Sequence, residues 1–105
     1  MTKLSRHFLR RKDPRRHLNC NATAECRGVS RKIKVVDFSS AGLRVDEVTG
    51  LTTGDCVLIV FAPDLSVEGT IVWSVWHKAG LKLSFPLAED DPVCIHLAKQ
   101  AASID

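Results

Sequence analysis

The sequence contains no tyrosine, and its 105 residues include only two tryptophans and four phenylalanines. Small barrels that bind single-stranded nucleic acids stack the bases on exposed aromatic side chains interleaved with lysine and arginine. Here most of the aromatic residues fall on the apolar parity of an expected strand. A nucleic-acid-binding barrel is therefore disfavoured, and it stays open as the alternative function.

Long hydrophobic runs are also missing, since no apolar stretch approaches the roughly 18 residues of a membrane-spanning helix. The N-terminus is charged and lacks the apolar centre of a secretory signal. We therefore expect a cytoplasmic protein that does not insert into a membrane. A chain of 105 residues has room for one domain with a single modest core.

The cysteines form no CxxC pair and no Cys/His cluster of zinc-binding spacing; they are Cys20, Cys26, Cys56 and Cys94. Cys20 and Cys26 fall on the apolar parity of one expected strand, where a thiol packs as a small hydrophobe. The prediction is reduced, buried thiols rather than disulfides or metal ligands.

Catalytic motifs are absent as well. The four histidines are scattered, and none belongs to a recognisable nucleophile–base pair or metal motif. Ser39 and Ser40 lack the context of a nucleophile elbow. We expect a binding protein rather than an enzyme, with no cofactor and no metal.

Charge is distributed unevenly along the chain. Residues 1–17 contain seven Lys or Arg residues and one acid, Asp13, which gives a net charge of +6. The rest of the chain contains eight basic and eleven acidic residues, a net charge of −3. We predict a flexible basic N-terminal arm over residues 1–17 and a mildly acidic barrel domain over residues 18–105. Such an arm points to a partner that carries phosphate groups.

Hydrophobic alternation predicts a series of short strands. Between Leu18 and Cys26 every second residue is apolar, which is the pattern of a strand with one buried face and one solvent-exposed face. The run from Cys56 to Phe61 is apolar throughout and predicts the most buried strand. Expected strands cover residues 18–26, 31–36, 43–46, 56–61, 65–76 and 81–85.

The long strand expected at residues 65–76 has three informative positions. Trp73 is in phase with Ile71 and is predicted to lie in the core. Gly69 predicts a bulge or bend. Trp76 has the opposite parity, so it either caps the core or lies on the surface beside a ligand.

The hydrophobic period changes near the C-terminus. Asp91 is a good N-cap and Pro92 suits the first helical position, so a short helix is expected at about residues 92–101. Six strands and one helix predict an all-β fold, a small six-stranded antiparallel barrel. The short C-terminal helix is expected to cover an open end or edge.

The stretch Asp37–Gly42 lies between two expected strands and has the composition of a turn. Asp and Ser side chains can bond backbone groups two residues on, and Gly42 can take a positive φ at low cost. Taken alone, this hexapeptide is a connecting turn. Upstream of it stands the basic run of residues 10–16, Arg-Arg-Lys-Asp-Pro-Arg-Arg.

Together the two stretches read RRxxxR, then about twenty residues, then DxSxxG. This pair of motifs resembles the PilZ family, whose domains bind the second messenger cyclic di-GMP. The resemblance covers roughly residues 10–86 and implies a small β-barrel. Arg16 is a departure, because many family members carry an apolar residue there.

The resemblance implies that the ligand-binding residues are Arg10, Arg11, Arg15, Asp37, Ser39 and Gly42. A guanidinium fork matches the O6 and N7 acceptors of guanine and also stacks on the base. A carboxylate accepts hydrogen bonds from guanine N1–H and N2–H2, and a hydroxyl donates to phosphate. We expect two cyclic di-GMP molecules per chain, because Arg10 offers an additional guanidinium for the second one.

The implied function is a cyclic di-GMP receptor or adaptor that changes conformation on binding and signals to an effector protein in trans. Ordering of the basic arm by the ligand is the expected change. A third reading is a PilZ-like domain that has lost its ligand and only docks on another protein. The intact motifs count against that reading.

Overall fold

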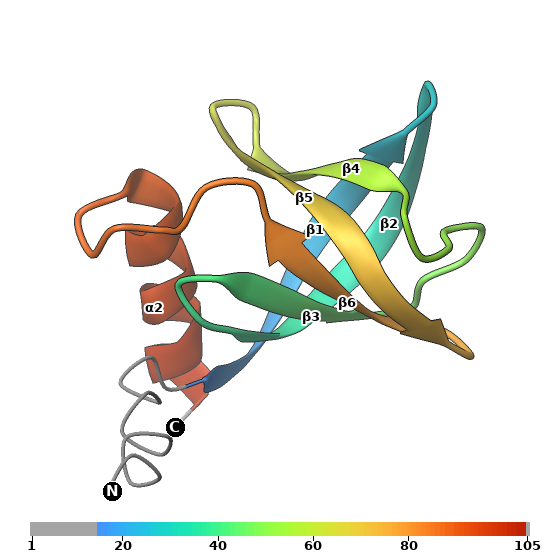
Figure 1. Cartoon of the computed structure of the whole chain (residues 1–105). Helices are drawn as coiled ribbons and strands as arrows, with labels where there is room; N and C mark the ends of the chain where they lie inside the picture. Colours follow the sequence, from blue (N-terminus) through green and yellow to red (C-terminus); the bar gives the residue numbers. More distant parts are fainter. Residues whose placement is uncertain (1–14, 105) are drawn as a thin grey trace, which may run out of the picture.

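Six antiparallel strands close into a barrel in the computed structural model, which describes residues 15–104 (Figure 1). The elements are β1 (Arg16–Cys26), β2 (Val29–Phe38), β3 (Gly42–Asp46), β4 (Cys56–Ala62), β5 (Leu65–Val75), β6 (Lys78–Leu83) and α2 (Pro92–Ile104). The order around the barrel is β1-β2-β3-β6-β5-β4, and β4 pairs back with β1. The predicted fold, a six-stranded antiparallel barrel with a C-terminal helix, is confirmed.

The strand β1 follows the predicted alternation. Its inward-facing residues are small or aliphatic, and all are buried: Leu18, Cys20, Ala22, Ala24 and Cys26. The largest fully buried side chains come from the other elements and include Ile59, Ile71 and Leu97. A narrow barrel needs this mixture of small and large side chains to fill its interior without voids.

Two of the predicted turns are two-residue hairpin loops. Arg27 (φ 51°) and Gly28 (φ 79°) both take a positive φ between β1 and β2, as a type I′ turn requires. Pro63 and Asp64 connect β4 with β5. Arg27 also donates a 2.7 Å hydrogen bond to Asp55, and this bond lowers the pKa of the Asp55 carboxyl.

The last hairpin turns earlier than the sequence suggested. Val75 pairs with Lys78, so Trp76 and His77 form the loop and β6 begins at Lys78. Ala79, which the sequence placed in the turn, is buried in the sheet. Trp76 has a positive φ of 60° and is 90% exposed, so it does not cap the core.

The prediction that Trp73 lies in the core is wrong, because this residue is 39% exposed. The cause is a β-bulge in β5. Ile71 pairs with Leu81 whereas Trp73 pairs with Gly80, so β5 contributes one more residue than β6 between these pairs. The extra residue reverses the alternation after Ile71. The indole lies against Gly80, where a Cβ atom would come within 2.1 Å of Trp73 Nε1.

Gly69, which was expected to mark a bulge or bend, lies in a regular part of the β5–β6 ladder. A Cβ atom at this position would lie 2.9 Å from the carbonyl oxygen of Lys82. Glycine is therefore required here by the close approach of two strands.

The strand β4 is not the most buried strand, contrary to the prediction. Cys56 and Leu58 are exposed, whereas Val57 and Ile59 are buried, so β4 alternates like its neighbours. Both faces of an apolar run look alike in the sequence, and here the second face of the strand is turned outward from the barrel.

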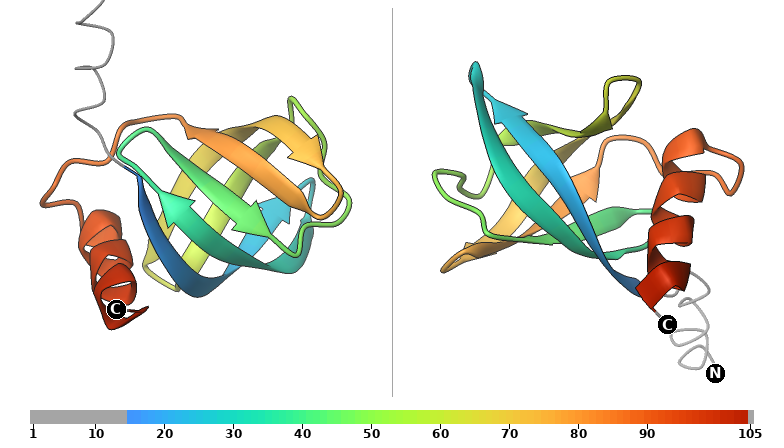
Figure 2. Two further views of the ribbon diagram at one scale, coloured as in Figure 1. Left: turned by 90° about the horizontal axis from the view of Figure 1, so that it is seen from below. Right: turned by 180° about the vertical axis from the view of Figure 1, so that it is seen from behind.

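The helix α2 starts as predicted, with the Asp91 Oδ1 atom accepting a 2.8 Å hydrogen bond from the backbone N–H of Val93. It extends to Ile104, beyond the expected end near residue 101. The helix packs mainly against β1 and lies beside the start of that strand in each view (Figures 1 and 2). Leu97 of α2 is fully buried in the barrel core.

All four cysteines are free. Cys20 and Cys26 are buried as predicted, whereas Cys56 is exposed and Cys94 is partly buried. Burial raises the pKa of the Cys20 thiol. Its Sγ atom lies 3.8 Å from Nε2 of His96, which belongs to the contact between β1 and α2.

Candidate ligand-binding site around Asp37

Asp37 lies near the end of β2 and is only 2% exposed. It pairs with Arg44 of β3 and His17 of β1, so it shares their face of the sheet, whereas Phe38 pairs with buried Leu43. The ladders on both sides of it are irregular. The β1–β2 pairing shifts between His17 and Cys20, and the β2–β3 pairing shifts between Val35 and Asp37. Bulges of this kind re-aim side chains, and here they flank a buried carboxylate.

The DxSxxG motif forms the connection between β2 and β3. Only residues 39–41 lie between the two strands, so the turn is shorter than the predicted hexapeptide. Ser39 donates its backbone N–H to the Gly42 carbonyl at 2.9 Å, and its Oγ accepts the N–H of Ala41 at 3.3 Å. The Ala41 carbonyl in turn accepts the N–H of Leu83 at 2.9 Å. These bonds hold the Ser39 hydroxyl in place next to Asp37.

Gly42 is required by a close approach and not by its backbone angle. Positive φ values occur at other glycines of the described chain and not at Gly42, so the freedom of glycine to adopt a positive φ is not used here. Gly42 pairs with Lys82 of β6, and a Cβ atom on it would lie 2.6 Å from the carbonyl oxygen of Leu81. A side chain at this position would force β3 away from β6.

Arg15 connects the two halves of the motif pair. Its Nε donates a short hydrogen bond to Asp37 Oδ1, and its Nη1 lies 3.4 Å from Ser39 Oγ. The structure thus brings together three of the residues that the motifs singled out. The other two arginines, Arg10 and Arg11, lie outside the described residues.

Two further basic side chains face the same carboxylate from the neighbouring strands. Arg44 and His17 are the cross-strand partners of Asp37 on β3 and β1. Arg44 Nη2 lies 3.6 Å and His17 Nδ1 lies 3.7 Å from Asp37 Oδ2, both longer than a hydrogen bond. Sequence reasoning missed Arg44, although its place two residues after Gly42 was a usable signal.

A shallow hollow of about 370 Å³ lies beside these residues. Arg15 and Arg44 line it on the polar side, and Val72 and Trp73 line it on the apolar side. The exposed indole is present at this place only because of the bulge in β5. The arrangement offers guanidinium groups for anions and an aromatic edge for a flat ligand.

The sequence model of the PilZ domain matches residues 9–100, which is nearly the whole chain. The chain belongs to the PilZ domain family. The family is in general one of cyclic di-GMP receptors, a family of binding domains rather than of catalytic ones. No curated protein matches the sequence significantly.

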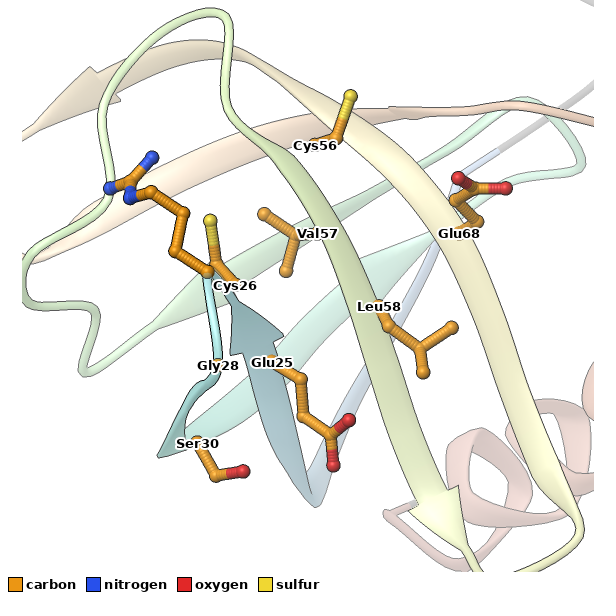
Figure 3. A pocket seen from close by; sticks show the side chains of 9 residues that line it. Glu25, Cys26, Gly28, Ser30, Cys56, Val57, Leu58 and Glu68 are labelled. Atoms are coloured by element: carbon orange, nitrogen blue, oxygen red, sulfur yellow. The ribbon is translucent and has the colours of Figure 1, made fainter.

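A second hollow of this PilZ barrel, about 600 Å³ in volume, lies around the β1–β2 turn and the start of β4 (Figure 3). Its lining contains the carboxylates of Glu25 and Glu68 and the thiols of Cys26 and Cys56. Arg27 also lines it but is bonded to Asp55, so the two carboxylates disfavour a phosphate-bearing ligand and this hollow does not compete with the Asp37 site. Within residues 15–104, no group of three His, Cys, Asp or Glu residues is placed to hold a metal ion.

None of the helical structure in residues 15–104 combines the length and the apolar character that a membrane-spanning helix needs.

Proposed function

We propose that this PilZ domain is a receptor for cyclic di-GMP and that the ligand binds over Asp37. The observation that carries the proposal is the buried Asp37 carboxylate, which lies between the guanidinium groups of Arg15 and Arg44. A few convergent polar groups beside a hollow that also has apolar and aromatic lining residues are a usual composition of a small-ligand site.

Guanine has the donors and acceptors that these side chains require. The Asp37 carboxylate accepts the N1–H and N2–H2 groups of one guanine, a donor pair that no other common base presents. Its Oδ2 atom lies beyond hydrogen-bonding distance of Arg44 and His17, so this acceptor is available. The Arg15 guanidinium, 36% exposed, reaches guanine O6 and N7 or stacks on the base.

Positively charged side chains for the phosphates of the ligand lie on the same side of the barrel as Asp37. Arg44 is half exposed next to the hollow, and the Ser39 hydroxyl donates to a phosphate oxygen. Arg10 and Arg11 complete the set in the proposed complex. Gly42 keeps β3 close to β6 and thereby holds Ser39 and Arg44 in register.

Ligand binding changes the contacts of Arg15, and this is the proposed origin of the signal. Arg15 is bonded to Asp37 without ligand. A guanine that takes the Asp37 carboxylate turns Arg15 toward the ligand, and the residues that precede Arg15 move with it. An effector protein that binds only one of the two arrangements senses the messenger in trans.

One observation favours the alternative, a barrel that binds single-stranded nucleic acid. Trp73 and Phe85 are exposed, and Trp76 is 90% exposed. Bases stack on such side chains without sequence preference. The buried Asp37 carboxylate speaks against this function, because a negative charge repels a polynucleotide backbone unless a guanine specifically pairs with it.

Calorimetric titration with cyclic di-GMP, GTP and single-stranded DNA separates the two functions. The receptor binds cyclic di-GMP selectively, and log K falls with a shallow slope against log salt because few counterions are released. Equal affinity for GTP, or no response to cyclic di-GMP together with a steep salt slope for DNA, contradicts the proposal.

The expected stoichiometry is two cyclic di-GMP molecules per chain, interleaved so that their guanines stack. Such a dimer concentrates four phosphates, and Arg10 supplies a guanidinium that stacks on the second molecule, an interaction of about 0.5–2 kcal/mol. Arg10→Leu removes this contact and shifts the calorimetric stoichiometry toward one. One ligand per wild-type chain, unchanged in Arg10→Leu, would show that Arg10 has no such role.

A further inference from the structure

The helix α2 carries two apolar stripes. One stripe is buried against the barrel and consists of Val93, Leu97 and Ala101. The other lines a groove of about 430 Å³ and consists of Cys94, Ile95, Ala98 and Ala102. Ile95 is 44% exposed although it is a large aliphatic residue. The part of the chain that the structure describes therefore presents a second apolar face of α2, which the proposed cyclic di-GMP site does not use.

The charged residues of this groove are separated into two ends. Glu89 lies three residues before the first residue of α2, and Asp90 and Asp91 follow it in the chain. Lys99 lies in the C-terminal half of the helix. Exposed Arg16 is the first residue of β1, and the start of this strand lies near the C-terminal end of α2 (Figure 1). The groove thus has an acidic end and a basic end, with the apolar stripe between them.

We propose that this groove is the interface of a weak homodimer, in which α2 packs antiparallel against α2 of a second copy of the chain. Antiparallel packing about a two-fold axis places the acidic end of each groove against the basic end of the other. Parallel packing would bring like charges together. The two apolar stripes then meet in the middle, where they exclude water. The proposal does not rest on cyclic di-GMP binding, because it concerns the ligand-free protein and a different surface.

The charge pairing also sets the register of the two helices. When Glu89 lies opposite Lys99 of the second copy, the two-fold axis passes midway between these positions, close to Cys94. A residue on a two-fold axis lies opposite its own copy. Cys94 is only partly buried and is a free thiol, so it reports on this register.

The interface is small. The 13 residues of α2 form a helix about 20 Å long and, with its side chains, about 10–12 Å wide. This footprint is well below the roughly 800 Å² per partner of a standard stable interface. We therefore expect a dimer that is populated only at high protein concentration, with a dissociation constant of about 10 µM to 1 mM.

Sedimentation equilibrium of the full chain without ligand, at low salt and from about 5 µM to 1 mM, tests the proposal. The mean mass is expected to rise from that of one chain toward that of two. Ile95→Glu places a charge in the apolar stripe and is expected to raise the dissociation constant about tenfold or more. Val29→Glu is the matched control, because Val29 is a similarly exposed aliphatic residue (46%) at the β1–β2 hairpin. It is expected to leave the dissociation constant unchanged.

Charge reversal tests the antiparallel arrangement. Glu89→Lys and Lys99→Glu are each expected to weaken the dimer about three- to tenfold, because each places like charges together at both ends. The double variant restores opposite charges and is expected to recover the wild-type dissociation constant to within about twofold. In a Cys56→Ser background, a short bis-maleimide is expected to link Cys94 to Cys94 of the second copy, since Cys20 and Cys26 are buried. Ile95→Glu abolishes this cross-link.

A single-chain mass at every concentration overturns the proposal and assigns the groove to some other occupant. A dimer that Ile95→Glu and Val29→Glu weaken equally, or that neither weakens, overturns the assignment to α2. A dimer that is lost in Ile95→Glu but not recovered by the double charge reversal, and that gives no Cys94 cross-link, overturns the antiparallel arrangement. Far-ultraviolet circular dichroism of each variant verifies that the barrel and helix are folded.

Discussion

Replacing Asp37 with asparagine is expected to weaken the binding of cyclic di-GMP by about a hundredfold or more. The carboxylate is proposed to accept two hydrogen bonds from one guanine, and each charged bond contributes about 1.5–3 kcal/mol. Asparagine keeps the volume but presents an NH2 group, which faces the donors of the base. Each loss of about 1.4 kcal/mol lowers affinity tenfold, so two bonds account for the expected effect. Isothermal titration calorimetry at constant salt measures it.

Asp46→Asn is the matched control for this experiment. It removes the same charge from the neighbouring strand β3, where Asp46 bonds to His77 at 2.6 Å. That bond, together with the backbone N–H of Glu47, lowers the pKa of the Asp46 carboxyl. Asp46→Asn is expected to leave the affinity for cyclic di-GMP unchanged. Equal losses in the two variants would show that only the net charge matters, and no loss in Asp37→Asn would remove the carboxylate from the site.

The strands that alternate regularly were predictable from the sequence. In β1 each second residue is small or aliphatic, and its buried face was identified correctly from Leu18 to Cys26. The helix start was equally clear, because Asp91 and Pro92 act locally on the helix that follows them. The motif pair also singled out Asp37, Ser39 and Arg15 as candidates, and the structure places these three side chains together.

Features that depend on how two strands pair with each other could not be predicted from the alternation of apolar residues in one strand. The bulge in β5 is visible only in its pairing with β6, and it moves Trp73 from the expected core to the surface beside Arg44. In the sequence, Arg44 looks like any other solvent-facing residue of an alternating strand. Only the β2–β3 register shows that it lies opposite Asp37. A one-residue change of register reverses which face a side chain occupies, so these positions need the fold.

Replacing Gly42 with alanine is expected to destabilise the barrel by about 1–3 kcal/mol, as overpacked positions do. The new Cβ atom would lie 2.6 Å from the Leu81 carbonyl oxygen, which belongs to the backbone and cannot rotate away. Because β3 and β6 must separate to relieve the contact, the ladder that holds the DxSxxG turn loosens as well. For a domain of this size the melting temperature is expected to fall by about 5–20 °C.

Asparagine substitutions distinguish two reasons for a glycine: the close approach of a neighbouring strand, and a positive backbone φ angle. Asparagine tolerates a positive φ better than alanine does but is larger. Gly42→Asn is therefore expected to be at least as destabilising as Gly42→Ala. Gly28 provides the matched comparison, because it has a φ of 79° and no atom within 4 Å of an added Cβ. There Gly28→Asn is expected to be milder than Gly28→Ala. Thermal unfolding of the four variants decides the matter: a Gly42→Asn protein more stable than Gly42→Ala would mean that the angle, and not the Leu81 carbonyl, requires glycine in the motif.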